Sequence, residues 1–482
     1  MASQNLEEAF FKENDTPHGL VKRILYKKYL QAYFPKTQYE KVSYNYKTII
    51  IDGFSGAGRY GNEWPNEIEK YGSPLIAVMV ALGFCRKKRI QVNRKRNAGD
   101  AAENVSIDTN VVWGSDPSTK NPENELLEEL KVKNIRTGIA DPNCDIHMYF
   151  VEKNRNNIIK LKCNMELIII RFLKRYYPSH KYGYAEEGSR TMFVIDTEPF
   201  SICIEIKRSE FSSFDPPSDL SHRNTRSLTF LDPFGYTHTP MERVQLFASA
   251  KGNEVLINFM SSYVNRFVSR NPGGVIKLFG MNDLEKVARL YGIERPDLEK
   301  NDDLVEFVKS VIRSCEPEDR SRFKNNICKI ARNYERFLRS KIECKFLQSF
   351  EVVDEGNTTL YHLIHTTNHP KGLEAMKESM NRCSQTEGEM QMSDYQVLRK
   401  GHVLNFGNKD KHEQVATVIY EQFAGRKDVH IDKISAFVRD NTPYVYRKKP
   451  LRILQKDGRI TRVRGRNGEL QTKNYNFSDT VE

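Results

Sequence analysis

Short apolar runs alternate with amphipathic stretches through most of this chain of 482 residues. Runs rich in β-branched and aromatic residues predict strands, whereas apolar positions that recur three and four residues apart predict helices. Strands are predicted over 46–52, 147–152, 191–195, 201–206, 228–232, 254–259, 350–353 and 359–364. Helices are predicted from Pro17 onward and over 73–82, 123–132, 154–175, 240–251 and 372–380, with a mostly helical region over 281–345.

The order of these elements predicts an α/β domain. Strands that alternate with helices form parallel sheets covered by helices on both faces. The last two predicted strands flank Asp354–Asn357, which is a good turn sequence. We therefore expect a doubly wound, mostly parallel sheet with an antiparallel edge hairpin. The domain should cover residues 46–383, with insertions at about 84–145 and 281–345, after an N-terminal helical segment over residues 1–45.

The C-terminal part of the chain has the pattern of a second, smaller domain. Residues 384–408 predict a linker, and residues 409–482 predict three helices followed by a hairpin. These helices are expected at about 410–423, 432–440 and 446–457, and the strands at 459–463 and 473–477. Such an arrangement is typical of a winged helix-turn-helix, whose third helix enters the major groove. The predicted nucleic-acid-binding residues are Arg447, Lys448, Lys449, Arg452, Lys456, Arg462 and Arg464.

Charge and hydropathy narrow the class of protein. The net charge is +12 and the pI is about 9.1, which favours a polyanionic partner. A basic cluster, Arg86–Arg89 with Arg94–Arg96, is expected between regular elements, either as a solvated loop or as a second nucleic-acid contact. No apolar stretch approaches the roughly 20 residues of a membrane helix, and the N-terminal sequence lacks a secretory signal. We expect an intracellular protein, cytoplasmic or nuclear, without membrane contact.

Cysteines and histidines do not predict a metal site. None of the eight cysteines shows CxxC spacing, so we expect them to be small buried side chains rather than zinc or redox ligands. His362 and His365 are three residues apart on a predicted strand, which directs them to opposite faces of the sheet.

Four acidic residues close predicted strands, namely Asp52, Glu152, Glu210 and Asp232. Ligands of doubly wound sheets bind beyond the carboxyl ends of the strands, so we expect all four to face one crevice. Asp52 leads directly into Gly53–Gly58, a G-x-x-G-x-G turn. Closely spaced glycines let the backbone approach a ligand. The sequence therefore predicts a nucleotide-like cofactor at this turn.

S-adenosylmethionine (SAM) and a nicotinamide dinucleotide both fit such a turn. For SAM, Gly56 and Gly58 would hold the methionine part, Asp52 its ammonium, Glu152 the ribose hydroxyls and Glu210 the adenine amine. Dinucleotide folds place the ribose acid about 20 residues beyond the glycines. Glu152 lies much further along the chain, so either fold would need an insertion between the glycines and this acid. The acid before the glycines and the edge hairpin favour SAM.

The candidate catalytic loop is Asp232-Pro233-Phe234-Gly235, which follows an apolar strand. A fixed carboxylate with backbone carbonyls would orient an acceptor amine toward the methyl group, and positioning is most of the catalysis in such a reaction. Phe234 would stack on a base. The alternative is an ordinary turn with a core phenylalanine.

These motifs, in this order, resemble the three-Cys-motif partner protein (TcmP) family over about residues 15–380. The matching residues are His18, Lys22, Ile24-Leu25, Tyr29-Leu30, Ile51–Gly58, Gly72–Leu75, Phe230–Gly235, Tyr361–Ile364, Gly372-Leu373 and Met376-Lys377. The resemblance implies a class I methyltransferase-like fold that binds SAM, and a radical-SAM-like partner with a three-cysteine motif. Lys22 and Phe54, which belong to these motifs, are counted among the predicted cofactor-binding residues.

The chain departs from the family by its long insertions and by His18-Gly19, where the family usually has Trp-Thr. Its Asp-Pro-Phe-Gly loop also differs from the Asp-Pro-Pro-aromatic loop of amino-methylating DNA enzymes, which disfavours methylation of a base amine. We expect a SAM-dependent methyltransferase acting on nucleic acid, to which the winged module delivers substrate. The alternatives are a catalytically silent SAM-fold protein that binds nucleic acid or a partner, and a protein-modifying enzyme.

Overall fold

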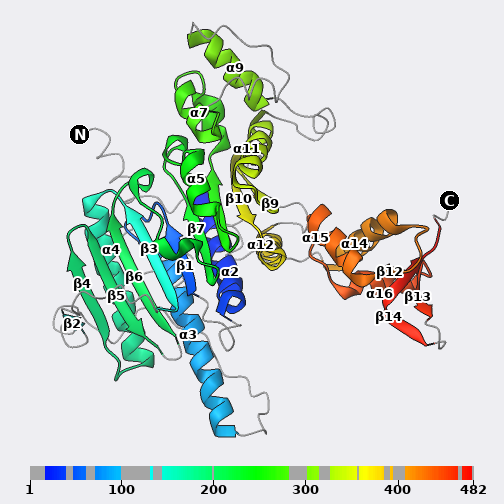
Figure 1. Cartoon of the computed structure of the whole chain (residues 1–482), viewed down its shortest axis with the longest axis horizontal. Helices are drawn as coiled ribbons and strands as arrows, with labels where there is room; N and C mark the ends of the chain where they lie inside the picture. Colours follow the sequence, from blue (N-terminus) through cyan, green and yellow to red (C-terminus); the bar gives the residue numbers. More distant parts are fainter. Residues whose placement is uncertain are drawn as a thin grey trace.

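An 11-stranded mixed sheet organises the larger part of the molecule (Figure 1). The structure is a computed structural model, and it describes residues 17–38, 47–60, 71–98, 131–133, 144–197, 200–281, 301–313, 326–354, 358–384, 391–393, 408–464 and 469–479. The predicted α/β class is confirmed.

The sheet is parallel at its centre, has antiparallel pairs on both sides of that centre, and ends on each edge with a short strand paired in parallel. Its spatial order is β11 (Gln391–Ser393), β9 (Phe346–Val353), β10 (Thr359–Thr367), β8 (Asn253–Phe259), β7 (Thr225–Leu231), β1 (Lys47–Asp52), β3 (Ile146–Glu152), β6 (Ser201–Arg208), β5 (Arg190–Asp196), β4 (Tyr182–Glu187) and β2 (Lys131–Lys133). Strands β8, β7, β1, β3 and β6 pair in parallel. Strand β10 is antiparallel to β8 and β9, and β5 is antiparallel to β6 and β4.

Helices cover both faces of this sheet, and the alternation of side chains along the strands divides the apolar core in two. One face packs against α2 (Pro17–Gln38), α3 (Ser73–Ala98), α4 (Arg155–Tyr176) and α12 (Pro370–Cys383). The other packs against α5 (Met241–Ala248), α6 (Ser261–Phe267), α7 (Pro272–Phe279), α9 (Asn301–Arg313) and α11 (Asn326–Ile342). On β1, Ile50 belongs to the first core, whereas Ile49 and Ile51 belong to the second, as a two-residue period requires.

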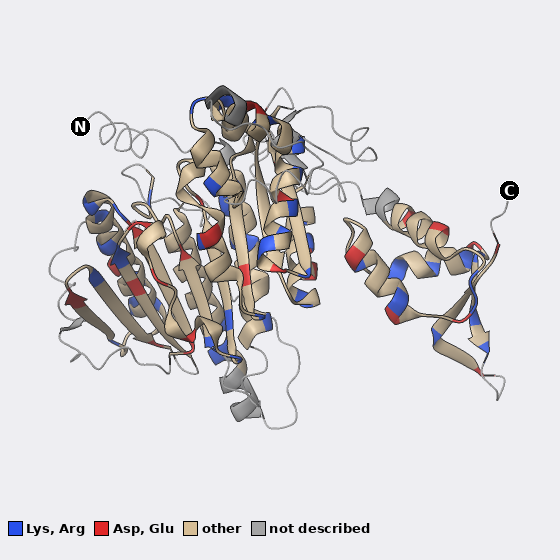
Figure 2. Ribbon diagram, turned by 45° about the horizontal axis from the view of Figure 1, so that its top comes forward, with Lys and Arg blue, Asp and Glu red and all other residues tan. Residues whose placement is uncertain are grey.

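The C-terminal module has a core of its own. Its helices are α14 (Asn408–Phe423), α15 (Ile431–Asn441) and α16 (Lys448–Lys456), and its sheet has the order β12 (Val429–His430), β14 (Leu470–Phe477), β13 (Ile460–Arg464). The three helices and the hairpin predicted from the sequence are therefore present. Lys and Arg residues lie both on this module and on the larger body (Figure 2).

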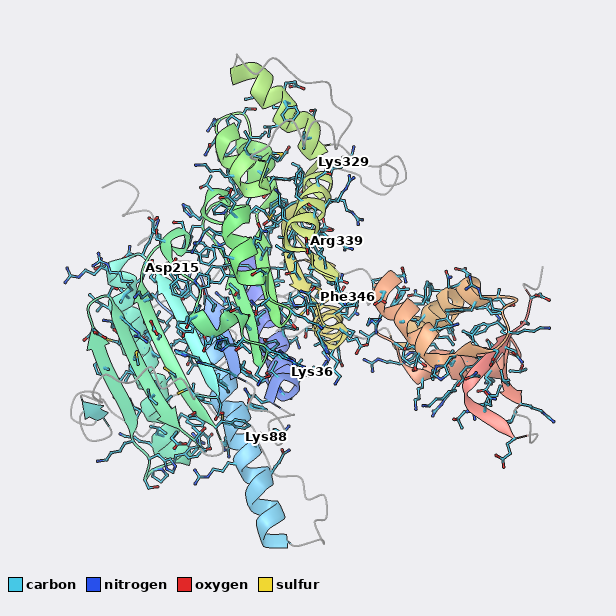
Figure 3. The ribbon with its side chains drawn as sticks, viewed as in Figure 1. Lys36, Lys88, Asp215, Lys329, Arg339 and Phe346 are labelled. Carbon is cyan, nitrogen blue, oxygen red and sulfur yellow. The ribbon has the colours of Figure 1, made fainter. Side chains whose placement is uncertain are left out.

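Side chains of α12 connect the module to the larger body. The ammonium of Lys377 donates to the carbonyls of Arg439 and Thr442 at the end of α15. On the next turn of α12, Asn381 Nδ2 donates to the carbonyl of Pro443 at 3.3 Å. The guanidinium of Arg439 also lies 5.7 Å from the ring centre of Phe346, on the side of the sheet nearest the module (Figure 3). The module is thus held by contacts of α12 as well as by the chain.

Three details of the predicted organisation are wrong. The basic cluster does not lie between elements, because α3 continues to Ala98. Stacking of Arg86 over Tyr176 and of Arg89 over Tyr177, with 4.0 and 4.6 Å between charge and ring centre, gives these basic residues packing partners at the end of α4.

The helix expected over 123–132 does not extend to its predicted end, because Lys131–Lys133 pair with β4 as a strand. The remainder of that helix lies outside the described residues. The predicted linker contains β11, which pairs with β9. The sequence patterns also missed β4, whose sequence is weakly apolar, and α6 and α7, which are short.

The cysteines and histidines have the following environments in the part of the chain that the structure describes. Of the six cysteines described, five are buried and Cys163 is exposed. His362 contacts Ser261 of α6 and His365 contacts Glu254 of β8, so the two rings point to opposite faces. The described residues contain no group of metal ligands. Among the described helices, none combines the length and the apolar character needed to cross a membrane.

Candidate functional site

The turn after β1 requires its glycines. Gly56 and Gly58 have φ of 61° and 77°, in the left-handed region that favours glycine. A Cβ on Gly58 would lie 2.8 Å from Leu161 Cδ1, and one on Gly72 would lie 2.9 Å from the backbone of Gly58. The turn is therefore packed tightly between α3 and α4, and larger residues are excluded at these positions.

Two buried acids at strand ends hold this turn in place. Asp52, the last residue of β1, accepts a hydrogen bond from the backbone N–H of Phe54 at 3.0 Å. Glu152, the last residue of β3, accepts from the N–H groups of Gly56 at 2.8 Å and Asn154 at 2.7 Å. Charge-assisted bonds of this kind fix loop geometry well. The carboxylates thus link the glycine turn to the ends of both strands.

Burial raises the pKa of the Asp52 carboxyl to about 7, and the nearby charges of Asp232 and Glu152 act in the same direction. Hydrogen bonding from Ser73 and Phe54 lowers this pKa, but by less than burial raises it. A cation next to Asp52 would favour its ionised form.

A cavity of about 180 Å³ lies beside the glycine turn. It is enclosed by α2, the turn after β1, the residues that follow β7 and β8, and parts of α6 and β10. The residues that line it are Gly19, Lys22, Arg23, Tyr26, Phe54, Ser55, Gly56, Tyr60, Ser73, Phe230, Asp232, Pro233, Phe234, Asn258, Met260, Tyr263 and Tyr361.

Asp232 is fixed at the wall of this cavity by an ion pair and an amide. Both of its oxygens lie 2.7 Å from the ammonium of Lys22 on α2. Its Oδ1 also accepts from Asn258 Nδ2 at 2.6 Å. The side chains of Lys22 and Asp232 are 16% and 25% exposed, so the pair is screened less than a surface pair. The rings of Tyr26 and Phe230, which also line the cavity, stack with centres 4.4 Å apart.

The cavity brings together some of the predicted site residues and not others. Predicted residues that line it are Lys22, Phe54, Gly56, Asp232, Pro233 and Phe234. Asp52, Gly58 and Glu152 are not among the lining residues but form or support the glycine turn that borders it. Glu210 is exposed, begins the short 3-10 helix Phe211–Ser213 and does not line the cavity. Its proposed contact with adenine stays a prediction.

Eleven of the residues that line the cavity were not among the predicted site residues, and they include Tyr26, Asn258, Tyr263 and Tyr361. One signal could have found Asn258, because it is a polar residue that directly follows the apolar run 255–257 of β8, the strand next to β7. Tyr26 has the helical spacing of a core residue, and Tyr361 was noted only as part of the family resemblance. No pattern distinguishes Tyr263 from an ordinary surface tyrosine.

The predicted nucleic-acid-binding residues lie on α16 and β13. Five of them are exposed and lie on or directly before α16, namely Arg447, Lys448, Lys449, Arg452 and Lys456. On β13, Arg464 is exposed and Arg462 is half-buried. The guanidinium of Arg447 lies 3.8 Å from the carboxylate of Glu378 on α12.

Comparisons with protein-family models, with curated proteins and with solved structures found no match to this chain.

Proposed function

We propose that the chain is a SAM-dependent methyltransferase that acts on nucleic acid. The observation that carries this proposal is that one cavity lies between the glycine turn after β1 and the Asp232-Pro233-Phe234 segment after the neighbouring strand β7. The strand order, with antiparallel β10 between β8 and β9, supports a doubly wound, class I methyltransferase-like fold. In such folds the ligand lies beyond the carboxyl ends of the central strands.

The charges around the cavity fit SAM, which carries an ammonium and a sulfonium. Asp52, Glu152 and Asp232 are close enough for the latter two to raise the pKa of Asp52. Gly56 and Phe54 would hold the methionine part, with Asp52 favouring its ammonium, and Glu152 is the proposed ribose ligand. When bound, SAM supplies a methyl group that its sulfonium already activates.

The residues of the chain would position the reacting groups rather than activate them. Lys22 and Asn258 hold the Asp232 carboxylate in one orientation at the cavity wall. A group held by such partners keeps the geometry that a transfer reaction needs. Asp232 would orient the acceptor, and Pro233 and Phe234 would shape the loop around it.

The C-terminal module would contribute affinity for the substrate. Its three helices and three-stranded sheet support a winged helix-turn-helix, and basic side chains of α16 are exposed. Lys and Arg contacts to phosphates dominate the affinity of such modules. A radical-SAM-like partner protein is proposed on the family resemblance alone.

One observation favours a second function, that of a catalytically silent SAM-fold protein. Lys22 contacts both oxygens of Asp232, so this carboxylate is already engaged within the chain. An acceptor would have to share Asp232 or displace Lys22. In this second function, nucleic-acid or partner binding would be the activity, and the cavity would hold SAM without turnover.

Calorimetry with SAM tests the proposal. We expect binding in the wild type, loss in Gly56→Arg, and no change in Gly188→Arg. Gly188 is the matched control because it also has a positive φ, 57°, and a Cβ at this position would meet nothing within 4 Å. Absence of SAM binding in well-folded wild-type protein would overturn the methyltransferase proposal.

Labelled SAM then separates the two functions. The enzyme requires Asp232→Ala to lose methyl transfer to DNA or RNA while it still binds SAM. If the wild type binds SAM but transfers no label to either nucleic acid, the silent function is favoured.

A further inference from the structure

Exposed aromatic side chains gather at the cavity. Among the residues that the structure describes, five large apolar side chains are exposed, namely Ile159, Phe234, Leu246, Tyr263 and Leu470. Two of these five line the same cavity, Phe234 with 42% and Tyr263 with 40% exposure. They come from different segments, the loop after β7 and helix α6. Scattered surface residues need no explanation, but two rings at one concave site indicate a ligand that stacks.

One buried polar atom at the cavity wall, Oδ1 of Asn258, has no hydrogen-bond donor among the described residues. The Asp232 carboxylate only accepts hydrogen bonds, so the NH₂ of Asn258 must face it and the amide oxygen must point away. Asn258 is 3% exposed, and its Oδ1 has no hydrogen-bond partner among the described residues. Buried acceptors are almost always paired in native proteins. A ligand N–H would satisfy this oxygen.

The charge at this wall is already balanced within the chain. Lys22 neutralises Asp232, and the stacked rings of Tyr26 and Phe230 also line the cavity. A cationic amine gains little beside a neutral pair, whereas a flat, uncharged ring with an N–H edge matches both the rings and the amide. The net charge of +12 favours a ligand that belongs to a polyanion.

We propose that the part of the cavity lined by Phe234, Tyr263 and Asn258, away from the glycine turn, takes a single unstacked nucleobase, which stacks on Phe234 and Tyr263 and donates an N–H to Oδ1 of Asn258. A base within a duplex cannot reach a cavity of this kind, so the substrate is a single strand or a base turned out of a helix. This inference names the substrate class of the proposed methyltransferase. Only the transfer of a methyl group to the bound base rests on that proposed function. Base binding itself is independent of it.

The test uses the full chain and a single-stranded DNA oligonucleotide that carries one 2-aminopurine. Its fluorescence reports stacking of that base alone, so contacts of the phosphates with the C-terminal module do not interfere. Stacking on one aromatic ring contributes about 1–3 kcal/mol, so Phe234→Ala and Tyr263→Ala should each weaken the fluorescence-detected affinity about 5- to 150-fold. Tyr263→Phe keeps the ring and should restore the affinity.

Leu246→Ala is the matched control, because Leu246 is 48% exposed and does not line the cavity. It should bind as the wild type does. All these positions are exposed, so their substitution leaves the core intact. If Phe234→Ala, Tyr263→Ala and Leu246→Ala bind the oligonucleotide equally well, the inference is overturned.

Competition tests the contact with Asn258. An oligonucleotide with adenine should displace the probe about tenfold better than one with unsubstituted purine, which lacks the exocyclic N–H. Asn258→Leu should remove this preference. Equal competition in the wild type would overturn the proposed N–H contact without recourse to the variant.

SAM calorimetry on the wild type separates this inference from the proposed function. Base stacking without SAM binding would refute the methyltransferase and leave the base site in place. SAM binding with no loss of base affinity in Phe234→Ala or Tyr263→Ala would refute the base site and leave the proposed methyltransferase in place. A free nucleoside that binds as tightly as the oligonucleotide would assign the same site to a small molecule and overturn the choice of a strand, whereas weaker binding of the nucleoside supports a strand.

Discussion

Three carboxylates, Asp52, Glu152 and Asp232, lie near one another around the glycine turn, and the ammonium of Lys22 pairs with Asp232. Like charges in a buried region favour protonation, which adds to the effect of burial in raising the pKa of Asp52 to about 7. The Glu152 carboxylate is instead stabilised by two backbone N–H groups that donate to it, those of Gly56 and Asn154. The proximity of these carboxylates therefore lowers the stability of the folded protein, and a bound cation would reduce this destabilisation.

We predict that the affinity for SAM rises about tenfold between pH 6 and pH 8. The folded-state pKa of Asp52 is raised from 3.8 to about 7, so its contribution to stability is present below pH 3.8 and is lost as the pH rises through 7. A cationic ligand binds the ionised form better, so the affinity changes in the opposite sense. Calorimetry across this range checks the prediction. Asp52→Asn should give a flat profile, and a flat profile in the wild type would contradict it.

Residue patterns predicted the parts of the candidate site that follow β1 and β7 better than the parts that lie on β8 and α6. The glycine turn and Asp232 were recognisable because a tight turn needs glycine and because an acid after a buried run is unusual. The only signal for Asn258 was its polarity near the end of β8, and Tyr263 had none, since the place of both residues at the cavity depends on how distant segments come together in the folded chain. Sequence spacing alone does not contain that neighbourhood.

At the scale of elements, helix α2 depends strongly on distant segments. Its Tyr29 donates to Glu254 of β8, and the same carboxylate contacts His365 Nε2 at 2.9 Å and Thr367 Oγ1 at 3.1 Å on β10. These groups are buried, so each depends on the others for hydrogen bonds. The network fixes the helix that carries Lys22 against the sheet.

Tyr29→Phe should therefore lower the free energy of unfolding by about 1–3 kcal/mol, because it leaves Glu254 without one of its donors. Tyr33→Phe is the control. The Tyr33 hydroxyl is buried and has no hydrogen-bond partner among the described residues, so its removal should be neutral or stabilising. Urea unfolding measures both. Equal losses in the two variants would mean that the network does not stabilise α2.

The contact between α12 and α15 gives a second prediction. Burial lowers the pKa of Lys377 to about 8, and its ammonium donates to two carbonyls at the end of α15. Lys377→Ala leaves these carbonyls without that donor, which should weaken docking of the module by about 1–3 kcal/mol.

Limited proteolysis between the larger body and the module measures this docking. Cleavage should be faster in Lys377→Ala and unchanged in Lys371→Ala, which removes an exposed lysine of the same helix. Cleavage at the wild-type rate in Lys377→Ala would show that other contacts hold the module.

Element types were easier to predict than element lengths. The apolar periodicity identified α2, α4 and the central strands, but it ended α3 too early because its later turns are basic. Residues of those turns stack on Tyr176 and Tyr177 at the end of α4, which a local pattern cannot reveal. Strand β4 was missed for a related reason, since its pairing with β5 and β2 stabilises a weakly apolar sequence.

At the scale of the whole molecule, two basic surfaces are separate. One lies on α16 of the C-terminal module, and the other on α3 of the larger body, where Lys87 is exposed. Both were candidates for nucleic-acid contact. The exposed helix of a small module reaches a groove more readily than a helix packed along a sheet, so we expect α16 to make more of the phosphate contacts.

Salt dependence distinguishes the two surfaces. The slope of log affinity against log salt falls by about 0.9 for each phosphate of duplex DNA that the protein no longer neutralises. Lys448→Ala with Arg452→Ala should therefore reduce the slope by about 1.8, whereas Lys87→Ala should leave it unchanged. Titrations of a duplex at several salt concentrations measure the slopes. A reduced slope in Lys87→Ala alone would move the binding surface to α3.

The long separation between α2 and its partners also has a consequence for synthesis on the ribosome. Tyr29 and Glu254 are 225 residues apart in the chain. At translation rates of about 5–20 residues per second, α2 emerges roughly 10 to 45 s before β8 exists to receive it. During that interval Tyr29 lacks the carboxylate of Glu254 that accepts its hydrogen bond in the folded protein. The nascent chain is thus expected to need a chaperone early, and codon changes that slow translation between α2 and β8 should lower the yield of folded protein.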